Sequence, residues 1–283
     1  MQRQGNIYIF SFAAIVCIIV SIIVALSSTA LKPRQKQETR LDVVRNILSV
    51  SGMPGDKIKS LKPAEVLSTF KENFSPLLLD KNNSKVDPSS LEKPLLDLGY
   101  TREELDEMFA FELINVFNAK VGLLSKRAGI SREEYDPGYK LVFLNLENNE
   151  IKQYIVPIDG YGLWGMMYGY IAIDRDLLTV KGIRFYNHQE TPGLGGECEK
   201  PWFTDQYIGK KILKEDGTFV SVNIVKGKSG DIFSGSELDH YVDGISGATI
   251  TGDSINSFIK DDLNKFEPYF QTIRNTAANG GIQ

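Results

Sequence analysis

The sequence predicts an α+β fold, in which an antiparallel sheet with flanking helices is preceded by one N-terminal transmembrane helix. Three observations support this prediction. Residues 7–26 are apolar and carry no charge. The middle of the chain holds short segments rich in β-branched and aromatic residues, which are typical of strands. An apolar stripe of helical period lies near the C-terminal end. Helices at both ends of a strand-rich middle favour α+β over repeated βαβ units.

The composition limits which partners and cofactors can be expected. The 283 residues are 42% hydrophobic and 24% charged, which is enough for one large core or two smaller ones. The formal net charge of −4 gives no reason to expect a nucleic-acid partner, which favours a concentrated basic face. Cys17 lies in the apolar run and Cys198 far from it, so a disulfide between them is implausible. Two cysteines and two histidines support no dedicated metal centre.

The first element is the apolar run, and residues 1–31 are expected to form an anchor in the lipid bilayer. As a helix, residues 7–26 would span about 30 Å, the thickness of a bilayer core. A cleaved signal peptide is the alternative, because Arg3 precedes the run and residues 28–30 are small. The apolar part of a signal peptide is usually only about 7–15 residues long, so we expect a retained anchor.

Residues 32–139 are expected to be a helical and loop-rich region ahead of the sheet domain. Apolar spacing over 41–48 predicts a helix, and a second helix should follow Pro63. Residues 73–94, rich in Asn, Ser, Lys and Pro, are expected to be a loop. Further on, Thr101 and Glu104 have the spacing of a capping box that begins another helix.

Residues 140–275 are expected to form the sheet domain. The predicted strands lie at 141–144, 154–158, 166–173, 180–186 and 219–225. A covering helix should begin near Ser254. Its apolar stripe consists of Ile255, Phe258, Ile259, Leu263, Phe266 and Phe270.

Just before this last helix, the segment 243–251 crowds small and hydroxyl residues together. The unpaired amides at a helix start favour an anion, and small residues let a ligand approach the backbone. The hydroxyls in reach belong to Ser246, Thr249, Thr251 and Ser254. The alternative is an ordinary helix cap, with Thr251, Asp253 or Ser254 accepting a backbone N–H.

Two further clusters are rich in glycine. In 159–165, three glycines bracket Tyr161, Leu163 and Trp164. This is either a simple turn or a place for a flat ring. In 188–196 the glycines fail the spacing of a dinucleotide fingerprint. There His188 and Glu190 could alternatively form an acid/base pair or bind metal. After the last predicted strand, Lys226 is either a solvated loop residue or a cation near a cofactor.

The motif Asp243-x-x-Ser246-Gly247-Ala248-Thr249 resembles the flavinylation motif of the FMN-binding domain family. The resemblance implies that FMN is attached covalently, through its phosphate, to Thr249. It also implies that the loop with Leu163 and Trp164 lies near the flavin. The second glycine-rich segment would line the flavin with His188, Glu190, Thr191, Gly193, Leu194 and Gly195.

The whole layout is similar to the C subunits of Na+-translocating NADH:quinone oxidoreductases. The resemblance implies a subunit, inactive alone, of a bacterial inner-membrane complex that passes electrons from NADH to ubiquinone and exports Na+. Its partners would be the other subunits and a flavin-attaching transferase. The G subunit of Rnf complexes, which exchange electrons between ferredoxin and NAD, is the nearest alternative. A membrane-tethered binding domain without flavin is another.

The orientation in the membrane has two conflicting indications. Positive charges after the anchor would keep the large soluble part in the cytoplasm by the positive-inside rule. They belong to Lys32, Arg34, Lys36 and Arg40. The family resemblance implies the opposite, namely a periplasmic domain, and we follow the resemblance.

Overall fold

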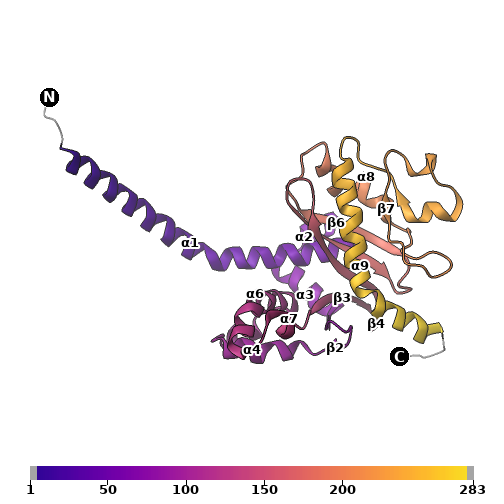
Figure 1. Cartoon of the computed structure of the whole chain (residues 1–283), viewed down its shortest axis with the longest axis horizontal. Helices are drawn as coiled ribbons and strands as arrows, with labels where there is room; N and C mark the ends of the chain where they lie inside the picture. Colours follow the sequence, from indigo (N-terminus) through magenta and orange to yellow (C-terminus); the bar gives the residue numbers. More distant parts are fainter. Residues whose placement is uncertain (1–4, 279–283) are drawn as a thin grey trace. The chain divides into compact units, whose positions relative to one another are not determined.

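The structure is a computed structural model that describes residues 5–278 (Figure 1). The chain divides into two compact units, one ending at Arg45 and the other beginning at Asn46. The first helix, α1 (Asn6–Val50), runs through the first unit and ends in the second. Its large apolar side chains from Tyr8 to Leu26 are exposed. This helix is long and apolar enough to cross a membrane, as the sequence predicts.

Eight further α-helices and eight strands are found in the described part of the second unit. The helices are α2 (Gly55–Ser60), α3 (Pro63–Asn73), α4 (Glu92–Asp97), α5 (Arg102–Asp106), α6 (Ala110–Ala128), α7 (Arg132–Tyr135), α8 (Pro201–Thr204) and α9 (Thr249–Ala278). The strands are β1 (Phe74–Leu79), β2 (Lys85–Val86), β3 (Lys140–Glu147), β4 (Glu150–Tyr161), β5 (Met166–Asp174), β6 (Val180–Asn187), β7 (Asn223–Ile224) and β8 (Tyr241–Val242).

Six strands form one antiparallel sheet in the order β2-β1-β3-β4-β5-β6. The four strands predicted between residues 141 and 186 are all present as β3 to β6. The predicted α+β class, with an antiparallel sheet and flanking helices, is therefore confirmed. The capping box is also present: the Thr101 hydroxyl accepts from the Glu104 amide, and the Glu104 carboxylate accepts from the Thr101 amide.

The loop predicted for residues 73–94 is wrong, because it contains β1 and β2. β1 pairs along its whole length with β3, with Leu77 opposite Val142. Leu77, Leu78 and Leu79 are buried. Pro76 has no amide proton to give, but β2 pairs only with Leu78 and Leu79, so β1 has a single neighbour at the proline.

The strand predicted for 219–225 is mostly wrong as well. Only Asn223 and Ile224 form β7, which pairs in parallel with β8. Ser221 has a φ of 64° and ends the extended run before it. The last helix begins at Thr249, earlier than the predicted Ser254.

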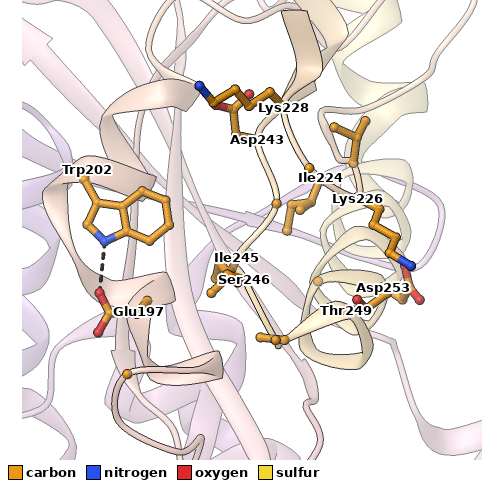
Figure 2. A pocket seen from close by; sticks show the side chains of 17 residues that line it. Glu197, Trp202, Ile224, Lys226, Lys228, Asp243, Ile245, Ser246, Thr249 and Asp253 are labelled. Atoms are coloured by element: carbon orange, nitrogen blue, oxygen red, sulfur yellow. Dashed lines mark hydrogen bonds between the residues drawn. The ribbon is translucent and has the colours of Figure 1, made fainter. Parts of the chain in front are cut away.

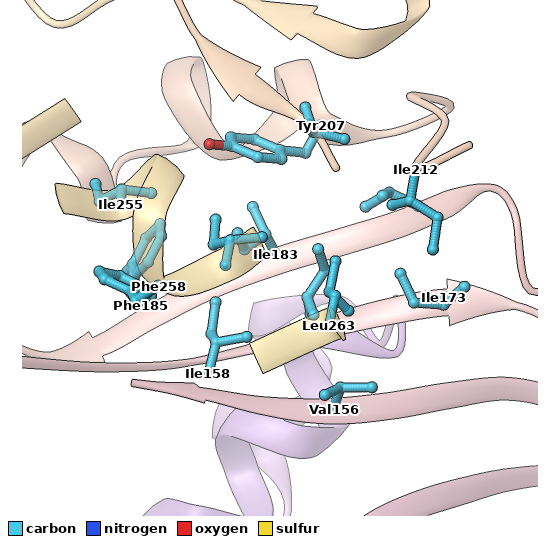
Figure 3. Packing of buried hydrophobic residues seen from close by; sticks show 14 of the residues in the cluster. Val156, Ile158, Ile173, Ile183, Phe185, Tyr207, Ile212, Ile255, Phe258 and Leu263 are labelled. Atoms are coloured by element: carbon cyan, nitrogen blue, oxygen red, sulfur yellow. The ribbon is translucent and has the colours of Figure 1, made fainter. Parts of the chain in front are cut away.

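α9 lies along one face of the sheet and closes the main core (Figure 1). The apolar stripe predicted from its periodicity is buried at every position. Figure 3 shows Phe258 and Leu263 of α9 among Ile158, Ile183 and Phe185 of the strands. Burying an apolar side chain of this size contributes roughly 1.5–3 kcal/mol. This packing fixes the position of the N-terminal end of α9 over the sheet.

The opposite face of the sheet packs against α3 and α6 through aromatic rings. Phe143 of β3 lies 5.8 Å from Phe70 of α3 and 6.2 Å from Phe111 of α6, between ring centroids. Both pairs meet edge to face, the geometry that aromatic quadrupoles favour. Both faces of the sheet are therefore covered.

Candidate functional site

A cavity of about 650 Å³ lies beside the N-terminal end of α9 (Figure 2). One wall is the segment after β7, from Val225 to Lys228. Another is the turn between β8 and α9, from Asp243 to Ala248. Gly193, Glu197 and Trp202 close a third side. The cavity thus joins three segments that are distant in the sequence.

Thr249 is the first residue of α9, and its side chain is exposed at the cavity. The residue before it is Ala248, whose methyl group cannot cap a helix. The amide of Gly252 bonds the Ala248 carbonyl at 3.0 Å. In the described chain, no hydrogen bond is formed by the amides of Thr249, Ile250 or Thr251. The helix start therefore offers unpaired N–H donors and the positive end of its dipole to an anion.

The four hydroxyls of the predicted segment have different surroundings. Ser246 and Thr249 are exposed and line the cavity. Thr251 is buried, and its hydroxyl donates to Glu190 Oε2 at 2.5 Å. Ser254 lines a separate hollow of about 400 Å³. None of Thr251, Asp253 and Ser254 caps the helix with its side chain, so the alternative of an ordinary helix cap does not describe this end of α9.

Gly247 is required by the shape of the turn. Its φ is 72°, a left-handed conformation that side chains disfavour. A Cβ at this position would lie 2.8 Å from Cδ2 of Leu194. Glycine therefore lets the predicted loop residue Leu194, which is 43% exposed, come against the turn next to Thr249.

Asp243 holds the cavity wall instead of pointing an unpaired carboxylate into the cavity. Its Oδ1 accepts from the amide and from the hydroxyl of Ser229, each at 2.7 Å. Its own amide donates to Gln206 Oε1 at 2.8 Å. Partial burial raises the pKa of Asp243, but the two bonds from Ser229 and the nearby lysines outweigh it and lower this pKa below its usual value. The ionised carboxylate thus fixes the segment after β7.

Glu190 ties the two predicted loops to α9. It is buried, and its Oε1 accepts from the Trp164 amide at 3.0 Å. Its Oε2 accepts from Thr251. The backbone of Gly195 packs so closely that a Cβ there would lie 2.5 Å from Glu190 Oε2. Glu190 is therefore a buried connection behind the cavity.

The other predicted residues lie outside the cavity lining. The Glu190 amide donates to Nδ1 of His188 at 3.2 Å, and Nε2 of His188 lies 3.6 Å from Glu199 Oε2. Thr191 accepts from the amides of Leu194 and Gly196 through its carbonyl. Leu163 is 47% and Trp164 63% exposed. Residues 5–278 contain no group of three His, Cys, Asp or Glu side chains able to hold a metal.

Among the charged and aromatic side chains that line the cavity, Glu197, Trp202 and Lys228 are not predicted from the sequence. Trp202 is 48% exposed, and its Nε1 donates to Glu197 Oε2 at 3.0 Å (Figure 2). Lys228 lines the cavity beside Lys226. The sequence gives only weak signals for them. Trp202 lies far from the motif in the sequence, and the triplet Lys226-Gly227-Lys228 is typical of any surface loop.

The comparisons with known proteins cover the part of the chain that forms this cavity. Residues 162–264 match the model of the FMN-binding domain family, and this range includes Thr249 and all segments of the cavity. The crystal structure of the C subunit of Na(+)-translocating NADH-quinone reductase from Parabacteroides distasonis is 28% identical, with a TM-score of 0.58 over 85% of this chain and 96% of that one. The crystal structure of Shewanella oneidensis NqrC has the same fold, with a TM-score of 0.59 at 23% identity.

Curated relatives cover nearly the whole chain. The C subunit of Na(+)-translocating NADH-quinone reductase from Yersinia pestis is 32% identical over 94% of this chain and 92% of its own length. The protein of the same name from Vibrio campbellii is 32% identical over 93% of both chains. The predicted resemblance is confirmed, and it favours the quinone reductase over the Rnf alternative. The chain belongs to the family of Na(+)-translocating NADH-quinone reductase C subunits.

Proposed function

We propose that this chain is the electron-carrying C subunit of a Na+-translocating NADH:quinone reductase and holds FMN through a phosphoester to Thr249. The observation that carries the proposal is the exposed Thr249 hydroxyl at the start of α9, beside a cavity and three unpaired amides. An oxygen nucleophile and a set of anion-binding donors lie together there.

The residues present fit FMN. The cavity of about 650 Å³ is in the usual range for cofactor sites, about 300–1,000 Å³. The unpaired amides and the Ser246 hydroxyl would hold phosphate oxygens. The exposed face of Trp202 and the side chain of Leu194 offer apolar surface for a flavin ring. Leu163 and Trp164 would contact the ring from the neighbouring loop.

The other predicted contacts keep a role in the proposal. Glu190 would act by fixing the Trp164 loop and α9, because both of its oxygens are engaged with them. Gly193 lines the cavity, and Gly195 allows the close packing at Glu190. His188 and Thr191 would hold the shape of the same loop. Asp243 would hold the opposite wall through Ser229.

Attachment needs an activated flavin, since joining FMN itself to a hydroxyl would have to release water. A flavin-attaching transferase would supply a flavin with a phosphoanhydride. Thr249 would supply Oγ1 for the new bond to phosphorus, the P–O bond of the anhydride would break, the nucleotide would leave, and the hydroxyl proton would pass to solvent. Bound FMN would supply a centre that accepts and passes single electrons. A phosphoester leaves the ring unmodified, so the surrounding side chains would set its potential.

NADH would be oxidised elsewhere in the complex. The described residues form an antiparallel sheet without the βαβ unit that binds dinucleotides. Rapid NADH oxidation by the flavinylated full-length chain, purified alone, would contradict this. The Na+ path would also lie in other subunits, because residues 7–26 carry no charged side chain for an ion route.

The soluble part would lie on the periplasmic side of the bacterial inner membrane, with α1 in the lipid. Protease added to intact spheroplasts should then digest residues after α1. Protection of this part until the cells are lysed would place it in the cytoplasm, in agreement with the positive-inside rule.

Covalent attachment is tested on the full chain co-expressed with the transferase. Denaturing electrophoresis under ultraviolet light should show a fluorescent band, and mass spectrometry a gain of FMN less one water. Thr249→Ala should abolish both signals, whereas Ser246→Ala should keep them. If Thr249→Ala keeps the added mass, the attachment site is wrong. If the wild type gains no mass, the chain carries no covalent flavin.

A further inference from the structure

Two lysines lie on the same wall of the cavity, but their side chains point in different directions. Lys226 and Lys228 are both exposed, and neither forms an ion pair within the described chain. Figure 2 shows the Lys226 amine on the side of Thr249 and Asp253. The Lys228 side chain lies beside Asp243, away from Thr249. The Lys226 amine therefore faces Thr249 and Asp253, whereas Lys228 faces Asp243.

The backbone that carries Lys226 is tied to α9. The amide of Ile224 donates to Asn256 Oδ1 at 2.6 Å, and Nδ2 of Asn256 donates back to the Ile224 carbonyl at 2.9 Å. Asn256 lies on α9, seven positions after Thr249, about two helical turns. Lys226 follows Ile224 by two residues. The two hydrogen bonds between Ile224 and Asn256 therefore fix the position of Lys226 along the axis of α9.

The segment that carries Lys226 is also hydrogen-bonded to the backbone of residues 242–244. The amide of Val225 donates to the Val242 carbonyl at 3.0 Å, and the amide of Gly244 donates to the Gly227 carbonyl at 2.8 Å. A Cβ at Gly244 would collide with the Val225 carbonyl oxygen, so the two backbones are in close contact. Lys226 thus projects from a backbone fixed on both sides.

With a phosphodiester on Thr249, two negative charges would lie close together at the start of α9, and a cation beside them would reduce their repulsion. Asp253 is four residues after Thr249, on the same side of α9, and it lines the cavity. A phosphodiester on Thr249 would add a second negative charge close to that carboxylate. The dipole at the helix start is equivalent to only about half a positive charge. One ammonium group facing both anions would offset most of the remaining negative charge.

Building on the proposed function, we infer that Lys226 is the cation that neutralises the FMN phosphodiester at Thr249, with Asp253 as the competing anion. Lys226 thus acts on the phosphate. Lys228 serves the wall at Asp243. The two lysines, equal in charge and two residues apart, make a matched pair for experiment.

The test follows flavin attachment to the full chain co-expressed with the transferase, sampled over time after induction. The readout is the flavinylated fraction of each variant by mass spectrometry. The variants are Lys226→Gln, Lys226→Arg, Lys228→Gln, Asp253→Asn, and Lys226→Gln combined with Asp253→Asn. Loss of a charge-assisted contact should slow attachment to Lys226→Gln about tenfold, equivalent to about 1.4 kcal/mol. Lys226→Arg and Lys228→Gln should stay within about twofold of the wild type.

The double variant separates charge from structure. Removing Asp253 as well should restore most of the attachment rate lost in Lys226→Gln, because one of the two competing anions is then gone. An equal slowing by Lys228→Gln, a wild-type rate for Lys226→Gln, or no recovery in the double variant would each overturn the inference. Thr249→Ala is measured alongside. Flavin retained in that variant would overturn the proposed function, which is a different result from any of these.

Discussion

The hydroxyl of Thr251 donates to Oε2 of Glu190 at 2.5 Å, and both side chains are buried behind the cavity. Two residues earlier, the Thr249 side chain is exposed. Thr249 and Thr251, two residues apart, therefore have different roles. Thr251 joins α9 to the loop of Glu190, while Thr249 presents a free hydroxyl to the cavity.

Thr251→Val should destabilise the fold, because valine keeps the shape but leaves a buried carboxylate oxygen without its donor. The expected cost is about 1–3 kcal/mol, measured as a lower midpoint of thermal unfolding of the full chain in detergent. Thr249→Val is the matched control. It should lose covalent flavin and change the stability of the flavin-free chain by less than about 0.5 kcal/mol. Equal destabilisation by both variants would contradict the division of roles.

Gly247→Ala and Gly227→Ala should destabilise the fold by similar amounts, because both glycines have positive φ. A Cβ at Gly227 meets no atom within 4 Å, whereas one at Gly247 meets Leu194 at 2.8 Å. Each should cost about 1 kcal/mol for the backbone, and the contact at Gly247 should add little, because Cδ2 ends a flexible, 43% exposed side chain that can rotate away. Thermal unfolding of the two variants measures the difference, and a much lower midpoint for Gly247→Ala would show that Leu194 cannot move aside.

Asp243→Asn should lower stability at pH 7, and the difference from the wild type should shrink in acid. The folded state lowers the pKa of Asp243 below 3.8, so it favours the ionised form. The stabilisation is present above the unfolded pKa, near 3.9, and is lost as the pH falls through the folded pKa. Urea unfolding of both proteins from pH 7 down to about pH 3 measures it.

Asp262 changes the wild-type curve in the opposite direction, since burial raises its pKa and outweighs the bonds from Lys265 and the Asp159 amide. Protonation of Asp262 as the pH falls thus favours the folded state. Taking the difference between Asp243→Asn and the wild type removes this contribution. A difference that stays constant with pH would show that Asp243 acts without its charge.

Trp202→Ala should leave attachment at Thr249 intact but expose the flavin. Trp202 is held by Glu197 on the cavity wall, far along the chain from the anion site at α9. The expected result is a normal gain in mass with stronger quenching of flavin fluorescence by iodide. Trp202→Phe, which keeps an aromatic face, should behave like the wild type. Unchanged quenching in Trp202→Ala would place the ring elsewhere.

Much of the fold is predictable from local patterns. The stripe from Ile255 to Phe270 is buried at every position, because α9 has one apolar face and one sheet to cover. The strand β1 is not predicted, because Pro76 and the polar residues on either side of the segment are typical of a loop. The segment is buried through its pairing with β3, which lies over sixty residues later in the chain. The alternation in 219–225 resembles a strand, yet the left-handed Ser221 interrupts it.

Sequence reasoning finds the cavity residues only where they lie together in one continuous segment. Asp243 and Ser246 to Thr249 lie in one motif and line one cavity. Trp202 and Lys228 join them only through tertiary contacts, such as the pairing of β7 with β8. The roles of Glu190 and Asp243 as internal connections are also hidden, because a carboxylate in a motif resembles a ligand until its partners are known.

The exposure of Thr249 on a completed helix bears on the order of maturation. Thr249 is exposed when α9 is fully packed on the sheet, so the proposed attachment would need no unfolded substrate. Folding can therefore come first and flavin insertion last. The proposed phosphoester to this rigid element would keep the flavin on each molecule, independent of later changes in the supply of free flavin.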